Sequence, residues 1–249
     1  MTAVATPDLL GPPQASSAGL VRRRLMVTWQ DPETRSYHQV GWLTQHIDGS
    51  YGYFYLPSAQ KLARFHPFVG FRDLDRDYHS AHLFPFFAQR LLSPLRPDLP
   101  RLLSALALEE SEASGPLEFL ARSGGRRGGD TVELLPEPLV EDDGSTCWLF
   151  LVHGVRHVPG AGEAIDRLLP GDTLNVLAQP DNPVNPDALL VTRGGQPLGW
   201  VPDPLLGDLR RITQPQLTVV RANPADLGHH LRLLVKVTGH VEYPNGSSA

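Results

Sequence analysis

The stretch QPDNPVNPDA at residues 179–188 is the most informative part of this chain. Each proline restricts the residue before it to an extended conformation, and Asn and Asp side chains hydrogen-bond to their own backbone in turns. The stretch joins two runs typical of β-strands, at 173–178 and 188–192. We therefore predict a rigid polar loop that stands at one rim of a β-rich module.

Short strand patterns recur on both sides of this loop. Turn-forming residues separate them, which is typical of small barrels, and the 24 Pro and 23 Gly of the chain fit this organisation. We predict a six-stranded, barrel-like module with short helices, within a β-rich α+β chain. The further predicted strands lie at 147–155, 197–201, 217–221 and 231–237, and a helix is predicted at 202–212.

Sequence motifs in this half of the chain resemble those of a known family. In order, they are VHGVRH at 152–157, LPGD at 169–172, the loop at 179–188, and QPLGWV at 196–201. This order resembles the HIRAN domain over residues 147–243. The resemblance implies a pocket that receives the 3′ end of single-stranded DNA, with VHGVRH as a strand that leads to an Arg–aromatic pair.

The resemblance also implies roles for individual residues. Arg156 would contact a phosphate, and His157 would stack on or hydrogen-bond to a nucleotide. Trp200 would flank the strand as a stacking surface. The alternative is that these residues only shape the module and its loop.

The loop carries the rest of the implied site. Asn182, next to Pro183, would contact the base or sugar, and Asn185 stands where the family has an acidic residue that caps the terminal hydroxyl. Val184 stands at an aromatic position of the family, so a stacking platform worth ~1–3 kcal/mol per base is missing. Asp203 replaces a basic residue and would repel phosphate. We therefore expect weaker or redirected binding.

The first half of the chain, residues 21–137, has a different pattern. Its segments at 40–60, 85–87, 90–92 and 115–125 resemble the small N-terminal α+β subdomain of HipA-type toxin kinases. The lysine, aspartate and metal-binding set of a kinase does not follow, so we expect no kinase activity. The predicted strands lie at 25–29, 40–43, 51–56, 115–121 and 131–135, and the predicted helices at 81–92 and 101–110.

An acidic, proline-bearing stretch separates the two patterns. We predict a linker at 138–146 between the two modules, with flexible tails at 1–20 and 244–249. The N-terminus is unlike a signal peptide, and no run approaches the length of a membrane span, so we expect a cytoplasmic protein.

Composition and side-chain chemistry limit the function. A net charge of −5 argues against coating of duplex DNA but permits a compact site for a strand end. The single cysteine, Cys147, lies in the apolar run CWLFL and is expected to be a buried, inert thiol. The histidines at 66, 79 and 82 lack the spacing of a zinc site. We expect no catalysis, metal or cofactor.

Together these patterns predict a non-enzymatic binding protein. It would bind single-stranded DNA or a DNA 3′ end, in DNA repair or phage defence, beside a separately encoded helicase or nuclease. The alternative is a protein–protein regulator, or antitoxin-like module, that engages a HipA-type kinase core or a helix-turn-helix partner.

Overall fold

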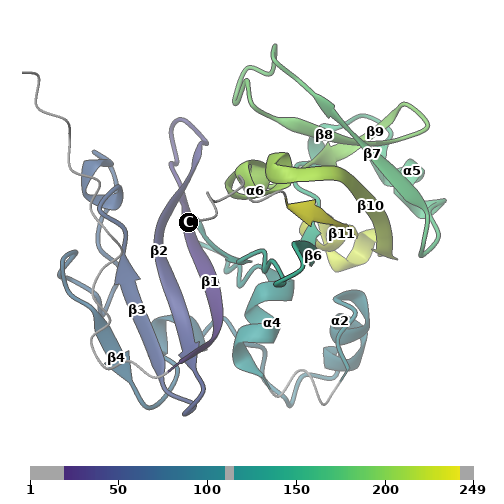
Figure 1. The fold of residues 1–249 in the computed structure, drawn as a ribbon. Helices are drawn as coiled ribbons and strands as arrows, with labels where there is room; N and C mark the ends of the chain where they lie inside the picture. The colour runs from purple at the N-terminus through teal and green to yellow at the C-terminus, as the bar shows by residue number, and fades with distance from the viewer. Residues whose placement is uncertain (1–19, 110–114, 242–249) are drawn as a thin grey trace, which may run out of the picture.

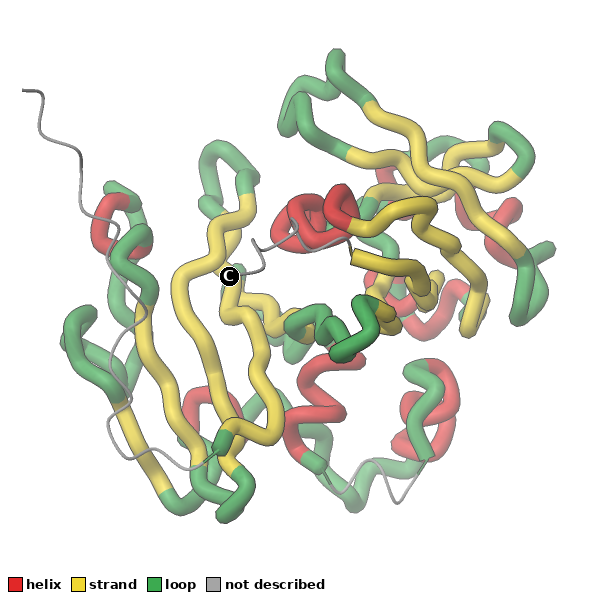
Figure 2. Tube along the Cα trace, in the orientation of Figure 1, coloured by secondary structure: helices red, strands yellow, loops and turns green. Residues whose placement is uncertain are grey.

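The chain forms two antiparallel sheets in the computed structural model, which describes residues 20–109 and 115–241 (Figure 1). The β-rich α+β class predicted from the sequence is confirmed. Strands and loops dominate, and the helices are short (Figure 2). None of the described helices is long and apolar enough to cross a membrane. The predicted tails lie outside the described residues, except for Leu20.

The first sheet has five strands in the order β4-β3-β2-β1-β5. Strand β1 occupies an interior position and is buried from Leu25 to Trp29, in agreement with its mainly apolar sequence. A loop at 31–36 joins β1 to β2. The strands are β1 (Val21–Gln30), β2 (Tyr37–His46), β3 (Tyr51–Tyr55), β4 (Tyr78–Ser80) and β5 (Val132–Pro136); the helices of this half are α1 (Pro85–Ala88), α2 (Leu99–Ala105) and α4 (Pro116–Ser123).

The second sheet has six strands in the order β6-β11-β10-β7-β8-β9. Over the described residues it does not close into a barrel. Instead, one isolated bridge joins His153, just after β6, to Trp200, the last residue of β9. The elements are β6 (Ser145–Leu151), α5 (Ala161–Asp166), β7 (Thr173–Ala178), β8 (Leu189–Arg193), β9 (Gln196–Trp200), α6 (Leu206–Arg211), β10 (Ile212–Ala222) and β11 (Leu233–Val241).

The strand predicted at 115–121 is wrong, because this segment forms helix α4. Its start and end signals are local: Pro116 is tolerated in the first turn, and Gly124 ends the helix in the left-handed conformation at φ 73°. Leu117 and Leu120 recur at helical spacing and are buried. The apolar composition of the segment obscured this helical period.

Three smaller expectations also differ from the structure. The helix predicted at 81–92 is reduced to the single turn α1. The strand predicted through 152–157 ends early, because Gly154 has φ 69° and a 3-10 turn follows at Val155–His157. Cys147 is exposed, since it lies on the outward face of β6, where side chains alternate between the two faces.

The two halves share buried apolar surface. Met26 of β1 and Leu135 of β5 belong to the same buried cluster as the core of the second sheet. A further cluster combines residues of both halves: Leu103, Leu106, Leu108, Phe119, Leu151, Leu231 and Leu234. Within the predicted linker, Val140 forms an isolated bridge with Thr146. The division into two domains remains a prediction.

Candidate functional site

Trp200 is held in one orientation at the end of β9. Its backbone exchanges two hydrogen bonds of 2.9 Å with His153, and its indole Nε1 donates to Oε1 of Gln179 at 2.7 Å. A Cβ on Gly154 would lie 2.5 Å from the indole Cε3, so only glycine allows the chain to approach the ring this closely. The ring is half-buried. It is therefore a fixed, partly accessible aromatic surface.

The 179–188 loop is organised by its own side chains, as the sequence predicts. Oδ1 of Asn182 accepts hydrogen bonds from the backbone N–H of Val184 at 3.0 Å and of Asn185 at 3.2 Å. Oδ1 of Asn185 accepts one from the N–H of Asp187 at 2.9 Å. Both amide oxygens are therefore used to shape the loop.

Hydrogen bonds also connect the loop to Trp200. The Nδ2 group of Asn182 donates at 3.3 Å to the same Gln179 oxygen that accepts from the indole. Pro183 and Val184 project from the loop and are exposed, Val184 by 55%. The loop and the aromatic surface thus form one rigid unit.

Arg156 and His157 lie on the 3-10 turn that follows Gly154, and both are exposed. Nε of Arg156 donates to Nε2 of His157 at 3.0 Å, so the two side chains lie together. The turn contacts β9, the strand that carries Trp200. The turn that carries this exposed guanidinium and imidazole therefore lies beside the strand that ends at Trp200.

A polar groove of about 400 Å³ lies beside the loop. We call it the interhalf groove, because residues of both halves line it. Figure 1 shows the loop between β1 and β2 close to α6, in agreement with this lining. Its lining residues are Ser36 and Tyr37 from the first half and Val184, Asn185, Asp187, Asp203, Leu206, Gly207 and Arg210 from the second.

The interhalf groove is lined by more acidic than basic side chains. Arg210 pairs with Asp187 at 3.1 Å and also donates to the Asp187 carbonyl at 2.6 Å. Asp203 adds a second carboxylate. The groove therefore offers acceptors in excess, which suits hydroxyl and amino donors better than a phosphate.

Sequence reasoning missed a buried ionic cluster that lies between the two halves. Glu133 of β5 is almost fully buried and accepts from Arg126 Nε at 3.0 Å and Nη2 at 2.8 Å. Its other contact is His153 Nε2, at 3.0 Å. Burial alone raises the pKa of Glu133, but the interactions with His153 and Arg126 outweigh it and lower the pKa to about 2. Nothing in the local pattern of these residues signals the cluster.

Tyr37 completes the cluster on the side of the interhalf groove. Its hydroxyl accepts from Arg126 Nη2 at 3.3 Å, and its ring lies 5.6 Å from that of His153. Burial, and then the neighbouring Glu133 carboxylate, raise the pKa of Tyr37.

No protein-family model and no curated protein matches this chain. Among solved structures, it is similar to the crystal structure of the HIRAN domain of human HLTF. The similarity covers 42% of this chain and 86% of that chain, with a TM-score of 0.31 and 18% sequence identity. At this level no residue role transfers from that domain. The HipA resemblance of residues 21–137 rests on sequence motifs alone.

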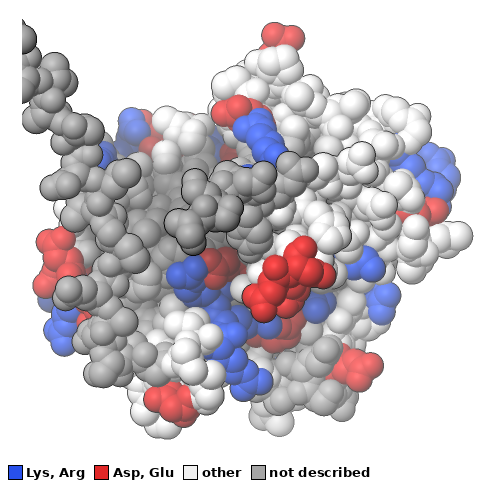
Figure 3. Space-filling model, viewed as in Figure 1, with Lys and Arg blue, Asp and Glu red and all other residues white. Residues whose placement is uncertain are grey.

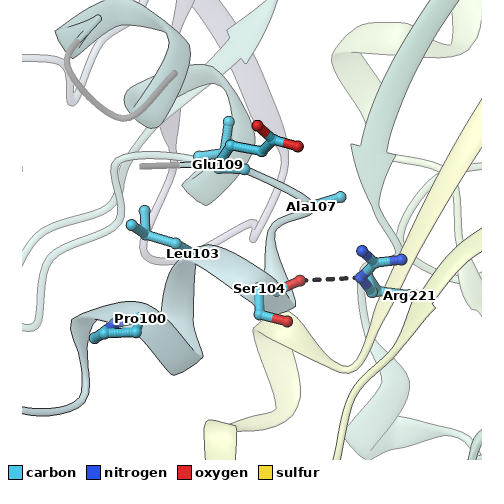
Figure 4. A pocket seen from close by; sticks show the side chains of 7 residues that line it. Pro100, Leu103, Ser104, Ala107, Glu109 and Arg221 are labelled. Carbon is cyan, nitrogen blue, oxygen red and sulfur yellow. Dashed lines mark hydrogen bonds between the residues drawn. The ribbon is translucent and has the colours of Figure 1, made fainter. Parts of the chain in front are cut away.

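A second groove, of about 420 Å³, lies between α2 and β10 (Figure 4). Arg221 and Glu109 are its charged side chains, and Nε of Arg221 donates to the Ser104 carbonyl at 3.0 Å. That guanidinium therefore serves to connect the two halves. None of the residues implicated by the sequence motifs lines this groove.

The distribution of surface charges and the arrangement of potential metal ligands describe the candidate site further. Acidic and basic side chains are intermixed on the face shown in Figure 3, so that face lacks the single-sign surface of a duplex-coating protein. Within residues 20–109 and 115–241, no group of three or more His, Cys, Asp or Glu side chains is arranged to hold a metal ion. The candidate site thus consists of an aromatic surface, a polar loop and a few charges.

Proposed function

We propose that this chain binds the end of a single DNA strand at Trp200 and the 179–188 loop, without catalysis. The observation that carries the proposal is the state of Trp200. Its indole is fixed by Gln179 and Gly154 yet remains accessible. Stacking of a base on such a ring contributes ~1–3 kcal/mol and tolerates any base sequence.

The exposed Arg156–His157 turn supports the proposal, because it supplies a phosphate contact near the ring. A guanidinium forms charge-assisted hydrogen bonds with phosphate oxygens. Since few cations lie at the site, binding depends only weakly on salt. The HIRAN-like motifs imply the same role for Arg156.

The interhalf groove favours binding of the end of a DNA strand over binding of an internal segment. Its volume of about 400 Å³ lies within the range of small-molecule pockets. The carboxylate of Asp203 can accept a hydrogen bond from a terminal hydroxyl, whereas a terminal phosphate would be repelled. A free 3′ hydroxyl is therefore the preferred end.

A strand-end binder of this kind would act in DNA repair or phage defence, beside a separately encoded helicase or nuclease. The alternative is a regulatory role in which the first half engages a HipA-type kinase core or a helix-turn-helix protein. Both roles require a protein partner.

The test is fluorescence anisotropy with a ten-nucleotide strand that carries a label at its 5′ end and either a hydroxyl or a phosphate at its 3′ end. Arg156→Ala and Trp200→Ala should each weaken binding by roughly 1–3 kcal/mol. Arg72→Ala, which removes an exposed arginine of the first half, is the matched control. Equal, steeply salt-dependent binding by all variants would reject the site and favour the protein-binding alternative.

A further inference from the structure

The first half of the chain contributes an aromatic ring to the interhalf groove. Tyr37, the first residue of β2, lines the interhalf groove together with Val184 and Asn185 of the loop. The sequence motifs place Val184 where HIRAN-like loops have an aromatic residue. The structure therefore brings a ring from the other half to the groove in which that loop aromatic is missing.

The Tyr37 ring is held in place before any ligand binds. Arg126 donates to its hydroxyl, and Glu133 holds Arg126 through two hydrogen bonds. The His153 ring packs at 5.6 Å from the tyrosine ring, with 44° between their planes. Because His153 is also bridged to Trp200, the tyrosine and the tryptophan are connected through one residue.

The loop before Tyr37 is also rigid. Oδ1 of Asp31 accepts from the N–H groups of Glu33 and Thr34 at 2.8 and 3.2 Å, and Arg64 pairs with the same carboxylate at 3.1 Å. The Gln30 side chain donates to the Arg35 carbonyl at 2.8 Å. A loop tied at several points loses little entropy when a ligand binds.

We infer that Tyr37 is the stacking platform for the terminal nucleotide of the bound strand, in place of an aromatic residue at position 184. This inference rests on the proposed function and extends it. The strand end then lies between the two halves, with Trp200 and Arg156 on the second half and Tyr37 on the first. Neither half alone forms the complete site.

The experiment uses the full chain and the same ten-nucleotide strand with a free 3′ hydroxyl. Tyr37→Ala should weaken binding by roughly five- to hundredfold, because it removes one base-stacking surface. Tyr37→Phe keeps the ring and should bind like wild type. Adding Val184→Tyr to Tyr37→Ala should restore most of the lost affinity, because it returns an aromatic ring to the same groove.

The matched control is His38→Ala, which removes the next ring along β2. Successive strand residues face opposite sides, and the His38 ring stacks on Trp29 rather than lining the groove. Binding by this variant should equal that of wild type. Thermal unfolding of every variant shows whether a loss of binding is a loss of folding.

A second measurement does not depend on the stability of any variant. Irradiation of wild-type protein with a strand that carries 5-iodouracil at its 3′ terminus should cross-link Tyr37, as located by mass spectrometry. If Trp200→Ala weakens binding but Tyr37→Ala does not, and Tyr37 is not cross-linked, this inference is wrong and the proposed function stands. If the wild-type chain does not bind the strand, both are wrong.

Discussion

The Cβ position of Gly154 lies 2.5 Å from Cε3 of Trp200, and Gly154 has φ 69°. Gly154→Ala therefore introduces both a backbone strain and a collision with the ring. We expect a loss of about 2–4 kcal/mol in the free energy of unfolding, or a displaced ring. Denaturation followed by tryptophan fluorescence measures both effects, and strand binding should fall with them.

Gly171→Ala is the matched control for that change. Gly171 also has positive φ, at 91°, but a Cβ there would meet nothing within 4 Å. Gly171→Ala should lower the free energy of unfolding only by the backbone strain, ~1 kcal/mol, and should leave DNA binding unchanged. Equal effects of the two substitutions would mean that contact with Trp200 is unimportant.

Glu133 should make stability depend on pH in the acid range. Its pKa is lowered from 4.5 to about 2, since His153 and Arg126 outweigh the effect of burial. The stabilisation is present above pH 4.5 and is lost as the pH falls toward 2. We expect a contribution on the order of 3 kcal/mol.

The comparison with Glu133→Gln isolates this effect from other carboxyl groups. The difference in unfolding free energy between wild type and variant, measured in urea, should be largest near pH 6 and small near pH 2. A difference that is constant over this range would show that the Glu133 charge does not stabilise the junction between the halves.

Arg232 should be one of the most sensitive charged positions in the second half. Its side chain is 1% exposed and donates to the Gly162 carbonyl at 2.6 Å and to Asp166 at 2.8 Å. Arg232 also donates from Nη1 to the buried Asn223 carbonyl. Arg232→Met keeps much of the volume but removes the partner of that carbonyl, and should lower the free energy of unfolding by about 2–3 kcal/mol. Chemical denaturation measures this loss, and Arg167→Met, at an exposed arginine, is the control. Similar losses of unfolding free energy in the two variants would contradict the prediction.

The segment between the halves should be cut without separating them. Glu141 lies in an exposed turn closed by the Gly144 N–H, which donates to the Glu141 carbonyl at 2.8 Å. A Glu-specific protease should cleave there, and the fragments should co-elute in gel filtration, because Met26 and Leu135 pack into the second core. Fragments that separate and stay folded would instead support two independent domains.

Local sequence was sufficient for much of the second half. Strand β7 has the predicted bounds, at Thr173–Ala178, and the 179–188 loop forms the predicted side-chain hydrogen bonds. The alternation of apolar and polar residues, the effect of proline and the hydrogen bonds from Asn side chains to the backbone each involve only a few neighbouring residues. They can therefore be predicted from the local sequence. Helix α4 was mistaken for a strand because an apolar run of that length fits both periods.

By itself, the sequence determined the β-rich class, most of the strands, and Trp200 and the 179–188 loop as candidates for a site. Only the tertiary structure decided that Trp200 rests against Gly154, and that Tyr37 lines the same groove as Val184. Tyr37 and its partner Arg126 are 89 positions apart in sequence. Such contacts depend on how elements that are distant in the sequence pack against one another, and no local pattern of residues encodes that packing.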